Sequence, residues 1–567
     1  MKTKIFILPL LLVTLLSVAC EKSESDLDYV VGDLPEITFD ETATKLAPDL
    51  FAVDETQYTR YYFDAESGDD ANDGLSESTP YKSLAMITAE LLATERVMIL
   101  LKCGTTFDSQ SISLTNVNSS EDFPLIIDSY GAGDRPMVAS NSYQCVTIEC
   151  DNVRIRNIAF TNPGGYRGIY IIDENREGAH MNIEITGCRF EYINWQDPSG
   201  VRSYTGIDPS NLDVESIASN YSKEYGGIFI TVDIVDETNP REPRWYENLY
   251  ITNNEFYQCC RTGVLLNSRD GCLTDSDLTA TIYPSKNVVI KGNKLEYIGG
   301  DGVVIMGAED VFIESNKLFY ANFLGRSGNA SAGLWPFKST NTYVQYNEVG
   351  YTQWDNGSGD AEGLDIDHGN KNTYVQYNYI HHNEGGGILL CATIFEHTNS
   401  LIRNNIFYRN GGSKKGSFMN ITSEVTNVKA YNNLVVLDNV NKQVIYNDDW
   451  YETGNAKNIE LYNNIFYSVE PTIGVFQHEC IENFVVSNNL YYNLGDLSRF
   501  DPSYISFDPE IMWESVGDGF GYDEMLALLR PANSNIYKCG TLFDGMLPFD
   551  IMGLTTLGKP YVGPYAE

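Results

Sequence analysis

Positive charge is scarce in this chain of 567 residues. Lysine and arginine together number 38 against 78 aspartate and glutamate residues, which leaves a formal net charge of −40 at pH 7. Proteins that bind nucleic acids need a basic surface, so this balance argues against a nucleic-acid partner. A polyanionic substrate would have to meet a locally basic cleft, and the bulk of the acid serves to keep the protein in solution.

Several chemical motifs are missing as well. The sequence holds no glycine-rich phosphate loop, no serine nucleophile elbow and no zinc-ligand motif. After the first twenty residues, no apolar run is long enough to span a membrane. The cysteines show no metal-ligand spacing, and only Cys145 and Cys150 are predicted to be able to pair in an oxidising compartment. The others fall mostly in apolar strand-like contexts typical of packed core thiols: Cys188, Cys259, Cys260 and Cys391.

The N-terminus reads as a targeting segment. A basic start over residues 1–4 precedes an apolar run over residues 5–16, and residues 16–20 (LSVAC) place small residues before Cys20. This arrangement resembles the lipobox of bacterial lipoproteins, which implies a signal peptide over 1–19 and lipidation of Cys20. The following acidic residues resemble the tag that sends such lipoproteins to the cell exterior in glycan-foraging Gram-negative bacteria. We therefore expect a lipidated, flexible tether over 20–55, and an outer-membrane lipoprotein exposed at the cell surface.

A repeat organises most of the chain. The pattern Asn-x-x-Ile-x-x-Asn-x-Phe recurs eleven times between Asn152 and Asn489, mostly at spacings of 23 to 31 residues. One turn of a parallel β-helix needs about this length, and the shortage of leucines argues against leucine-rich repeats. The seventh position is asparagine in nine copies. Asparagine tolerates left-handed φ and can hydrogen-bond from coil to coil, so these residues are predicted to be structural.

The two ends of the repeat differ from its middle. Residues 60–83 resemble the N-terminal cap of secreted β-helix proteins, and we expect a helix over about 83–94 within it, because an uncapped first coil would expose a strand edge. Residues 501–567 are predicted to be an irregular C-terminal cap. The expected fold class is all-β: a right-handed parallel β-helix of about 11–12 coils over residues 56–500. Insertions near 195–245 and 270–286 are expected to wall a binding face.

A second set of strands begins with glycine and supplies the candidate site. Alternation along a strand places Trp335 and Phe337 outward on one coil, and Asp365 and Asp367 outward on the next. The coils lie about 4.8 Å apart, so an aromatic pair that could stack on a sugar adjoins an acidic pair. Phe337 and Trp335 are equally compatible with packing under a loop.

Further carboxylates surround this acidic pair. Asp360 and Glu362 come just before it, and Glu384 follows one coil later. Together Asp360, Glu362, Asp365 and Asp367 could hold a hard cation such as Ca²⁺, or a pair of carboxylates could share protons in catalysis. A solvated acidic strand is the alternative without function.

Basic side chains near these strands complete the candidate set. Lys338 and His368 occupy equivalent positions at the ends of the two strands and suit general acid or base roles. Four more residues are candidates for substrate binding: Arg261, Arg269, His381 and His382.

Residues 60 to about 540 resemble the right-handed parallel β-helix superfamily of secreted polysaccharide lyases and glycoside hydrolases. The Asp-Asp and Gly-His-Gly motifs of polygalacturonases are missing, so that hydrolase family is excluded. The resemblance implies a polysaccharide substrate, and we expect a monomer that meets the membrane only through its lipid.

Three functions remain open. The favoured one is a lyase acting on a uronic-acid polymer of glycosaminoglycan or pectin type, with Lys338 or His368 as base, Ca²⁺ on the acidic cluster and Arg261 on the substrate carboxylate. The second is a glycoside hydrolase that uses two carboxylates from among Asp365, Asp367 and Glu384. The third is a glycan-binding surface lipoprotein without catalysis.

Overall fold

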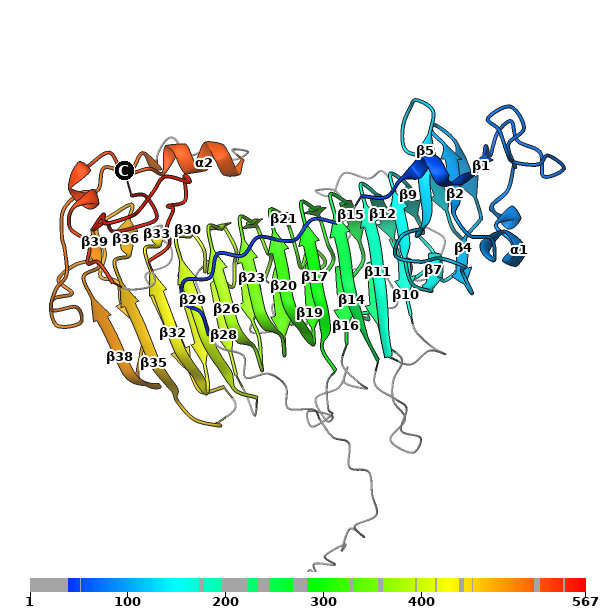
Figure 1. Ribbon diagram of the computed structural model, residues 1–567. Helices are drawn as coiled ribbons and strands as arrows, with labels where there is room; N and C mark the ends of the chain where they lie inside the picture. The colour runs from blue at the N-terminus through cyan, green and yellow to red at the C-terminus, as the bar shows by residue number, and fades with distance from the viewer. Residues whose placement is uncertain are drawn as a thin grey trace, which may run out of the picture. The chain divides into compact units, whose positions relative to one another are not determined.

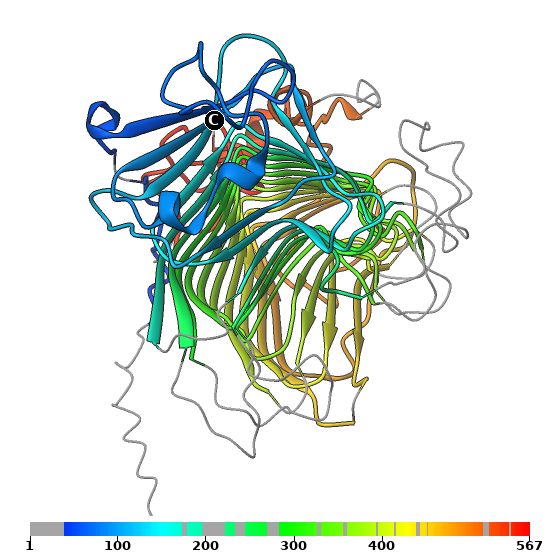
Figure 2. The same cartoon turned by 90° about the vertical axis from the view of Figure 1, so that its right-hand side faces the viewer.

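The computed structural model describes residues 39–50, 52–172, 178–195, 222–232, 244–268, 283–325, 330–354, 360–392, 395–412, 416–437, 443–450, 452–513, 521–543 and 546–566. Residues Glu41–Glu567 form one compact unit, and Met1–Asp40 are a separate one. Within the larger unit the chain winds through three parallel sheets in turn, as Figures 1 and 2 show from the side and from one end. The predicted all-β parallel β-helix is confirmed.

The first sheet contains fourteen strands among the described residues. In spatial order they are β1 (Thr59–Phe63), β2 (Val97–Lys102), β5 (Leu125–Tyr130), β8 (Val153–Arg156), β11 (Gly178–Thr186), β14 (Arg244–Thr252), β17 (Ser285–Lys291), β20 (Ala308–Glu314), β23 (Thr340–Gln345), β26 (Lys371–Gln376), β29 (His397–Arg403), β32 (Val425–Tyr431), β35 (Ala456–Tyr462) and β38 (Ile481–Ser487).

The second sheet contains thirteen short strands in the same described ranges. They are β3 (Thr106–Asp108), β6 (Met137–Ala139), β9 (Ala159–Thr161), β12 (Arg189–Ile193), β15 (Glu255–Cys259), β18 (Lys294–Glu296), β21 (Lys317–Phe319), β24 (Glu348–Gly350), β27 (Tyr379–His381), β30 (Ile406–Tyr408), β33 (Leu434–Leu437), β36 (Ile465–Ser468) and β39 (Leu490–Tyr492).

The third sheet contains twelve described strands and will carry the candidate site. They are β4 (Ile112–Thr115), β7 (Gln144–Glu149), β10 (Arg167–Ile171), β13 (Gly226–Thr231), β16 (Thr262–Asn267), β19 (Val303–Met306), β22 (Leu334–Phe337), β25 (Glu362–Ile366), β28 (Gly386–Cys391), β31 (Met419–Thr422), β34 (Gln443–Asp448) and β37 (Val475–Phe476).

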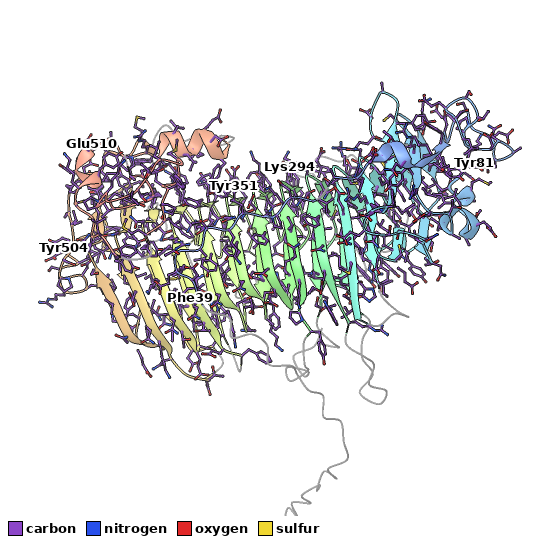
Figure 3. All side chains as sticks on the ribbon, viewed as in Figure 1. Phe39, Tyr81, Lys294, Tyr351, Tyr504 and Glu510 are labelled. Atoms are coloured by element: carbon purple, nitrogen blue, oxygen red, sulfur yellow. The ribbon has the colours of Figure 1, made fainter. Side chains whose placement is uncertain are left out.

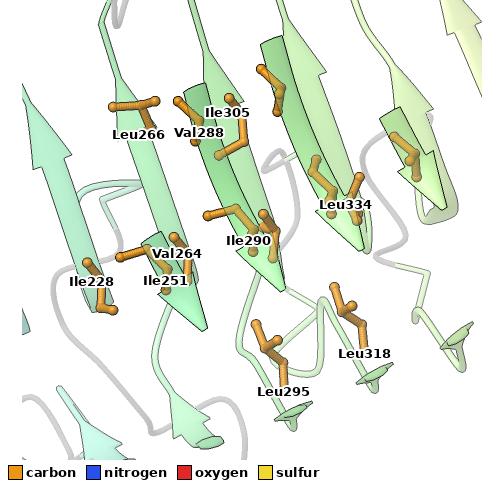
Figure 4. Close-up of a cluster of buried hydrophobic side chains, with 14 of the residues drawn as sticks. Ile228, Ile251, Val264, Leu266, Val288, Ile290, Leu295, Ile305, Leu318 and Leu334 are labelled. Carbon is orange, nitrogen blue, oxygen red and sulfur yellow. The ribbon is translucent and has the colours of Figure 1, made fainter. Parts of the chain in front are cut away.

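The core fills the space that the three sheets enclose. Figure 4 shows inward side chains of successive coils in rows, such as Ile251 and Ile290 from the first sheet, Leu295 from the second and Ile305 from the third. These residues are almost completely buried. Full burial of one such side chain contributes about 1.5–3 kcal/mol, so the column of aliphatic residues is the main source of stability for a fold in which each coil contacts only its neighbours.

The repeated asparagines line a buried ladder at the bend after the first sheet. Asn316 Nδ2 donates to Asn347 Oδ1 at 3.0 Å, and the same oxygen accepts the Asn316 backbone N–H at 2.9 Å. Asn347 binds Asn378 in the same way. The ladder continues to Asn489, where Asp501 terminates it. The predicted structural role of these residues is confirmed.

We expect Asn347→Ala to lower the free energy of unfolding by about 2–4 kcal/mol, because it leaves buried hydrogen-bonding groups on both neighbouring coils unsatisfied. Asn341→Gly is the control, since Asn341 belongs to the partly exposed ladder near the start of the same strand, donates to Asp310 at 3.4 Å and accepts from Asn372 at 3.1 Å. Glycine is used because Asn341 has φ of 53°, which alanine would adopt only with strain. Urea denaturation followed by circular dichroism gives both values. Equal losses for the two variants would contradict the role of the buried ladder.

The N-terminal cap is less helical than predicted. A helix was expected over about 83–94, and the structure has the 3₁₀ turn η2 (Leu84–Met86) followed by α1 (Ala89–Leu92). Thr88 separates them, because its hydroxyl accepts the Leu91 N–H and caps a new helix.

The predicted tether over 20–55 is too long. Residues 41–54 lie along the outer face of the first sheet, where the dark blue segment crosses successive strands in Figure 1. Arg403 Nη2 donates to the Ala43 carbonyl at 2.8 Å, Gln345 Nε2 donates to the Lys45 carbonyl at 2.9 Å, and Ala47 N–H donates to Glu314 at 3.0 Å. The polar side chains of this sheet thus pair with backbone that would otherwise stay solvated. A 3₁₀ turn, η1 (Glu55–Gln57), then leads into β1.

The C-terminal segment covers a sheet rather than only closing the last coil. The helix α2 (Tyr522–Leu528) and the 3₁₀ turn η7 (Ser534–Tyr537) lie over the second sheet, beside β30 to β39 in Figure 1. Met525 and Leu529 are buried there against aromatic residues including Tyr379 and Tyr408.

No helix within the described ranges is long and apolar enough to cross a membrane. Cys145 and Cys150 are buried free thiols, so the pairing predicted for them is wrong.

Candidate active site

The outer face of the third sheet carries the predicted site. Leu334 and Leu364 point into the main core, whereas Trp335 and Phe337 belong to a separate outer cluster. The same cluster contains Ala332 from their own coil and residues from three other coils: Phe229, Leu265, Val304 and Met306. The predicted alternation is therefore confirmed for these strands.

Trp335 is not an open platform. Its side chain belongs to a residue only 5% exposed, and the Lys223 ammonium lies 4.7 Å from the centroid of its ring. The indole N–H donates to Asp301 Oδ1 at 2.9 Å. Phe337 is likewise buried and meets the His368 ring edge-on at 5.9 Å between centroids. Trp335 and Phe337 therefore form the floor of the site, the packing alternative left open by the sequence.

Asp301 is the first residue that the sequence analysis missed. Its Oδ2 accepts from Arg261 Nη1 at 2.5 Å, and both side chains are completely buried. Its Oδ1 accepts the Ala332 N–H at 3.1 Å. A Cβ on Gly300 would lie 2.1 Å from Arg261 Nη1, so only glycine admits the guanidinium. The glycine run at 299–302 was the available signal.

Arg261 consequently has a different place from the one predicted. A guanidinium that is buried against Asp301 does not project from the strand face toward a sugar. Its charge compensates Asp301, which in turn orients Trp335. We infer a positioning role for Arg261. Arg269, the second predicted arginine, lies outside the described residues.

Lys223 is the second residue that the sequence analysis missed. It lies just before β13, one coil before Arg261, and its backbone carbonyl accepts from Thr262 Oγ1 at 2.9 Å. Burial lowers the pKa of Lys223, while the carboxylates of Asp301, Asp367 and Asp360 oppose that shift. The negative charges of those three carboxylates therefore act on the ammonium. Its position ahead of a glycine-initiated strand was the only signal in the sequence.

Asp365 is the most strongly perturbed carboxyl group of the site. It is 7% exposed, and its Oδ1 has no hydrogen-bond partner among the described residues. Burial raises its pKa well above the ordinary value of 3.8, and the nearby Asp367, Asp360 and Glu362 raise it further. Asp365 is therefore a carboxylic acid that holds its proton at higher pH than an ordinary aspartate.

Asp367 lies beyond the end of β25 and meets two other polar side chains. Its Oδ1 accepts the His368 backbone N–H at 2.8 Å and lies 3.3 Å from His368 Nε2. The same ring nitrogen is 3.9 Å from Cys391 Sγ on β28. Asp367, His368 and Cys391 are the one group of three potential metal ligands, among the residues described, whose ligand atoms all lie within 4.8 Å of one another. Cys391 is buried, as predicted for a core thiol, but it faces the site.

The other predicted acidic residues occupy different surroundings. Glu362 is fully buried, and its Oε1 accepts from Asn420 at 2.8 Å. Glu384 lies between the second and third sheets, where its carboxylate accepts the Trp354 N–H at 2.7 Å. Asp360 is partly exposed just before β25, and Ala361 after it has φ of 98°. A non-glycine residue with that φ stores strain at the entrance to the strand.

This arrangement does not fit the Ca²⁺ predicted on Asp360, Glu362, Asp365 and Asp367. In the described part of the chain, no three of these carboxylates form a group with all ligand atoms within 4.8 Å. Glu362 is engaged with Asn420, and the surroundings of Asp365 favour the neutral acid. A hard cation needs several ionised or carbonyl oxygens converging on one point.

Two predicted histidines lie away from the acidic cluster, whereas Lys338 lies beside His368, whose backbone carbonyl accepts the Lys338 N–H at 2.8 Å. The Lys338 ammonium lies 3.7 Å from the centroid of the Phe395 ring. His381 is on β27 of the second sheet, where burial lowers its pKa and its Nε2 lies 3.6 Å from Glu348 Oε1. His382 follows it and stacks at 5.0 Å on Tyr351, which Figure 3 marks near the C-terminal segment. Of the predicted histidines, only His368 joins the acidic residues.

We expect Asp365→Asn to stabilise the protein at neutral pH, with a rise in melting temperature of about 1–3 °C. A raised pKa means that the folded state binds the proton more tightly than the unfolded state, so stability falls as pH rises above the ordinary value of 3.8. Asparagine removes that loss. The gain should therefore be present at pH 7 and disappear near pH 4.

Thermal melts of both proteins in the presence of a chelator, between pH 4 and pH 8, make this measurement. Asp360→Asn is the control, because Asp360 is partly exposed. A lower melting temperature for Asp365→Asn at pH 7 would show that the carboxylate is stabilised rather than strained by its surroundings.

Comparisons with known proteins agree with this fold. A family model described as a right handed beta helix region matches residues 245–449. The chain has a right-handed parallel β-helix fold. The predicted hand of the helix is thereby confirmed, as is the resemblance to that superfamily.

Two relatives are named lacto-N-biosidase. The chain is 24% identical over 373 residues to a lacto-N-biosidase of Bifidobacterium longum subsp. longum, and the match covers 54% of this chain and 23% of that protein. The chain thus spans about a quarter of the curated relative's length. The crystal structure of a GH136 lacto-N-biosidase from Eubacterium ramulus is 21% identical, with a TM-score of 0.51 and coverage of 70% of this chain and 67% of that one.

A third similarity concerns a lyase. The pectate lyase Pel9A is 12% identical, covers 90% of this chain and 96% of its own, and gives a TM-score of 0.37. That score is too low to carry an argument. The β-helix proteins similar to this chain therefore include carbohydrate-active enzymes, and the lyase chemistry favoured by the sequence gains no specific support from them.

Proposed function

We propose that this protein is a glycoside hydrolase whose reacting carboxylates come from the cluster Asp360, Asp365 and Asp367. The observation that carries the proposal is the placement of Asp365 on the outer face of the third sheet, one coil from Trp335, where the charges of Asp367 and Asp360 act on its buried carboxyl group. Glycoside hydrolysis requires one carboxyl group that donates a proton and a second that is ionised.

Asp367 is the ionised partner in this proposal. The His368 N–H donates to its Oδ1, and the imidazole of His368 lies beside it, so the negative charge is stabilised while the second oxygen remains available. It attacks the anomeric carbon directly or activates a water that does so.

The proton donor is one of the two remaining aspartates. Asp365 has the raised pKa that suits an acid at neutral pH, whereas Asp360 is the more exposed carboxyl group. Asp365→Asn and Asp360→Asn separate them. The proton donor causes the fall in kcat/KM at high pH. The variant whose pH profile loses this fall therefore identifies the donor, and the other variant keeps it.

The substrate in this proposal is a neutral glycan. Arg261 is paired with Asp301, and the Lys223 ammonium lies against the Trp335 ring, where burial lowers its pKa, so neither is placed to bind a uronic acid. The related lacto-N-biosidases make oligosaccharides that contain lacto-N-biose the first substrates to try.

Incubation with a panel of neutral oligosaccharides and uronic-acid polymers tests the reaction class. Hydrolysis produces new reducing ends without absorbance from a carbon–carbon double bond, and this result is expected. Growth of ultraviolet absorbance on a uronic-acid polymer would establish elimination and overturn the hydrolase. A glycan-binding protein would retain glycan on a column and release neither product.

Lyase chemistry remains the second candidate because His368 does lie in the site. Its Nε2 lies 3.3 Å from Asp367 Oδ1 and 3.9 Å from Cys391 Sγ. The Lys338 ammonium lies over Phe395 and is a poorer base candidate than the sequence predicted.

We also propose that the protein acts as a monomer at the cell surface, anchored by a lipid on Cys20, a residue outside the described ranges. The lipobox-like residues 16–20 support this. Cys20→Ser is expected to move the protein from the detergent phase to the aqueous phase in a detergent-partitioning experiment on expressing cells, and Cys103→Ser is expected to leave it in the detergent phase. Equal partitioning of the wild type and Cys20→Ser would contradict lipidation at that residue.

A further inference from the structure

The cluster of Asp367, His368 and Cys391 has a composition that the hydrolase does not explain. Carboxylate pairs suffice for glycoside hydrolysis, so neither a thiol nor an imidazole is required beside them. Cys391 is buried, yet its sulfur faces a ring nitrogen that also meets Asp367. Cysteine, histidine and aspartate are together the typical ligands of Zn²⁺.

We propose that Asp367, His368 and Cys391 bind a borderline divalent cation, with Zn²⁺ as the first candidate. Three protein ligands leave a fourth position open, as in zinc sites that exchange a water or a ligand. A hard cation such as Ca²⁺ is disfavoured by the thiolate and the imidazole.

The distances between the ligand atoms fit this cation. Tetrahedral coordination with Zn–N and Zn–O near 2.0 Å and Zn–S near 2.3 Å places nitrogen and oxygen about 3.3 Å apart and nitrogen and sulfur about 3.6 Å apart. The structure has 3.3 Å between His368 Nε2 and Asp367 Oδ1, and 3.9 Å between His368 Nε2 and Cys391 Sγ. A shift of a few tenths of an ångström brings the Cys391 sulfur to the required distance from His368 Nε2, and all three ligand atoms already lie within 4.8 Å of one another.

A second observation also points to a ligand at this place. The Asp365 carboxyl group is buried on the same strand face, and its Oδ1 has no hydrogen-bond partner in the described part of the protein. Such an atom is costly unless water, substrate or a metal-bound water reaches it. A water in the open position of the cation is a suitable donor to it.

The ligands also explain why no zinc motif is visible in the sequence. Asp367 and His368 follow β25, whereas Cys391 ends the next strand of the sheet, β28. The separation of 23 residues between His368 and Cys391 is one coil of the β-helix. The zinc ligands are therefore brought together by coil stacking rather than by a local loop.

Binding is coupled to one proton. The Cys391 thiol loses its proton when sulfur bonds to Zn²⁺, and the proton passes to buffer, while Asp367 and His368 bind as carboxylate and neutral imidazole. Because Asp367 is also the proposed ionised carboxylate of catalysis, bound Zn²⁺ blocks the hydrolase. That consequence rests on the proposed function, whereas the binding itself does not.

The test uses the whole purified protein, stripped with chelator and titrated with Co²⁺ and then Zn²⁺. A thiolate-to-cobalt charge-transfer band that saturates at one equivalent and is displaced by Zn²⁺ is expected. Cys391→Ser should lose the band and weaken Zn²⁺ binding at least tenfold in calorimetry, and His368→Gln should weaken it comparably. Cys103→Ser, which changes a partly exposed free thiol far from these strands in sequence, should retain both.

Two outcomes overturn the proposal. The first is a wild-type protein that shows no thiolate band and binds no Zn²⁺ at micromolar concentration. The second is binding that persists in folded Cys391→Ser and His368→Gln, with folding checked by circular dichroism. Zinc inhibition of glycan hydrolysis is measured separately. Zinc binding without any glycan hydrolysis would support the zinc site and contradict the proposed hydrolase.

Discussion

Asp367→Asn is expected to lower kcat/KM on the cleaved glycan by about 10³-fold or more, with little change in melting temperature. Asparagine keeps the size and the hydrogen bond from the His368 N–H, whose distance to Asp367 Oδ1 is 2.8 Å. It removes the negative charge that attacks the anomeric carbon or activates water. The loss therefore reports on chemistry rather than on folding.

The product of the reaction identifies what Asp367 does. If it is a nucleophile, then Asp367→Gly should recover activity when azide is added and should form a glycosyl azide, because the small anion occupies the space of the lost carboxylate. If it is a general base, the wild-type product has the inverted anomeric configuration, which nuclear magnetic resonance of the fresh product detects.

One control variant accompanies this series. Glu384→Gln is expected to change kcat/KM by less than tenfold, because the Glu384 carboxylate accepts the Trp354 N–H at 2.7 Å between the second and third sheets. Full activity of Asp367→Asn would remove Asp367 from catalysis. A fall in the melting temperature of Asp367→Asn together with its activity would assign Asp367 a structural role.

Asp301→Asn is expected to destabilise the protein by about 3–5 kcal/mol, the second large effect. The substitution leaves the buried Arg261 guanidinium without its counter-charge at a pair separated by 2.5 Å. It also disturbs the carboxylate that accepts the Trp335 N–H, so the floor of the site is expected to loosen and kcat/KM to fall. Urea denaturation measures the loss of stability, and intrinsic tryptophan fluorescence detects the loosening around Trp335.

The double variant Arg261→Met with Asp301→Asn separates charge from packing. Removal of both charges is expected to recover most of the lost stability, since a buried ion pair contributes little over neutral groups of similar size. Lys294→Met is the surface control, because Lys294 pairs with Glu296 at 2.8 Å while half exposed. Its expected cost is about 0–1 kcal/mol. If the double variant is no more stable than Asp301→Asn, the lost stability comes from disrupted packing and hydrogen bonds rather than from the unpaired charge of Arg261.

The two effects connect the fold to the site. Asp301, Trp335 and Asp365 come from three successive coils. A displacement of Asp301 therefore shifts the Trp335 indole on the next coil, because the indole N–H donates to Asp301. The zinc ligands add a fourth coil. A solenoid places such residues at one strand spacing from each other without any loop between them.

Sequence alone determined what depends on local periodicity. The spacing of the asparagines predicted the coil, because each bend needs a buried side chain that bonds its neighbour on the next coil, as Asn347 bonds Asn378. The positive φ at this bend belongs to the preceding residue, Tyr346, with φ of 58°. Alternation along the glycine-initiated strands placed Trp335 and Asp365 on one outer face, because successive strand residues point to opposite sides.

Tertiary structure decided everything that depends on which coils and segments lie side by side. Arg261 pairs with an aspartate 40 residues away, and Lys223 lies over a tryptophan more than a hundred residues away, so neither partner could be read from local spacing. The docking of residues 41–54 and the placement of the C-terminal segment on the second sheet are of the same kind. Burial and charge act through space, and these contacts converted predicted sugar-binding residues into the buried floor of the site.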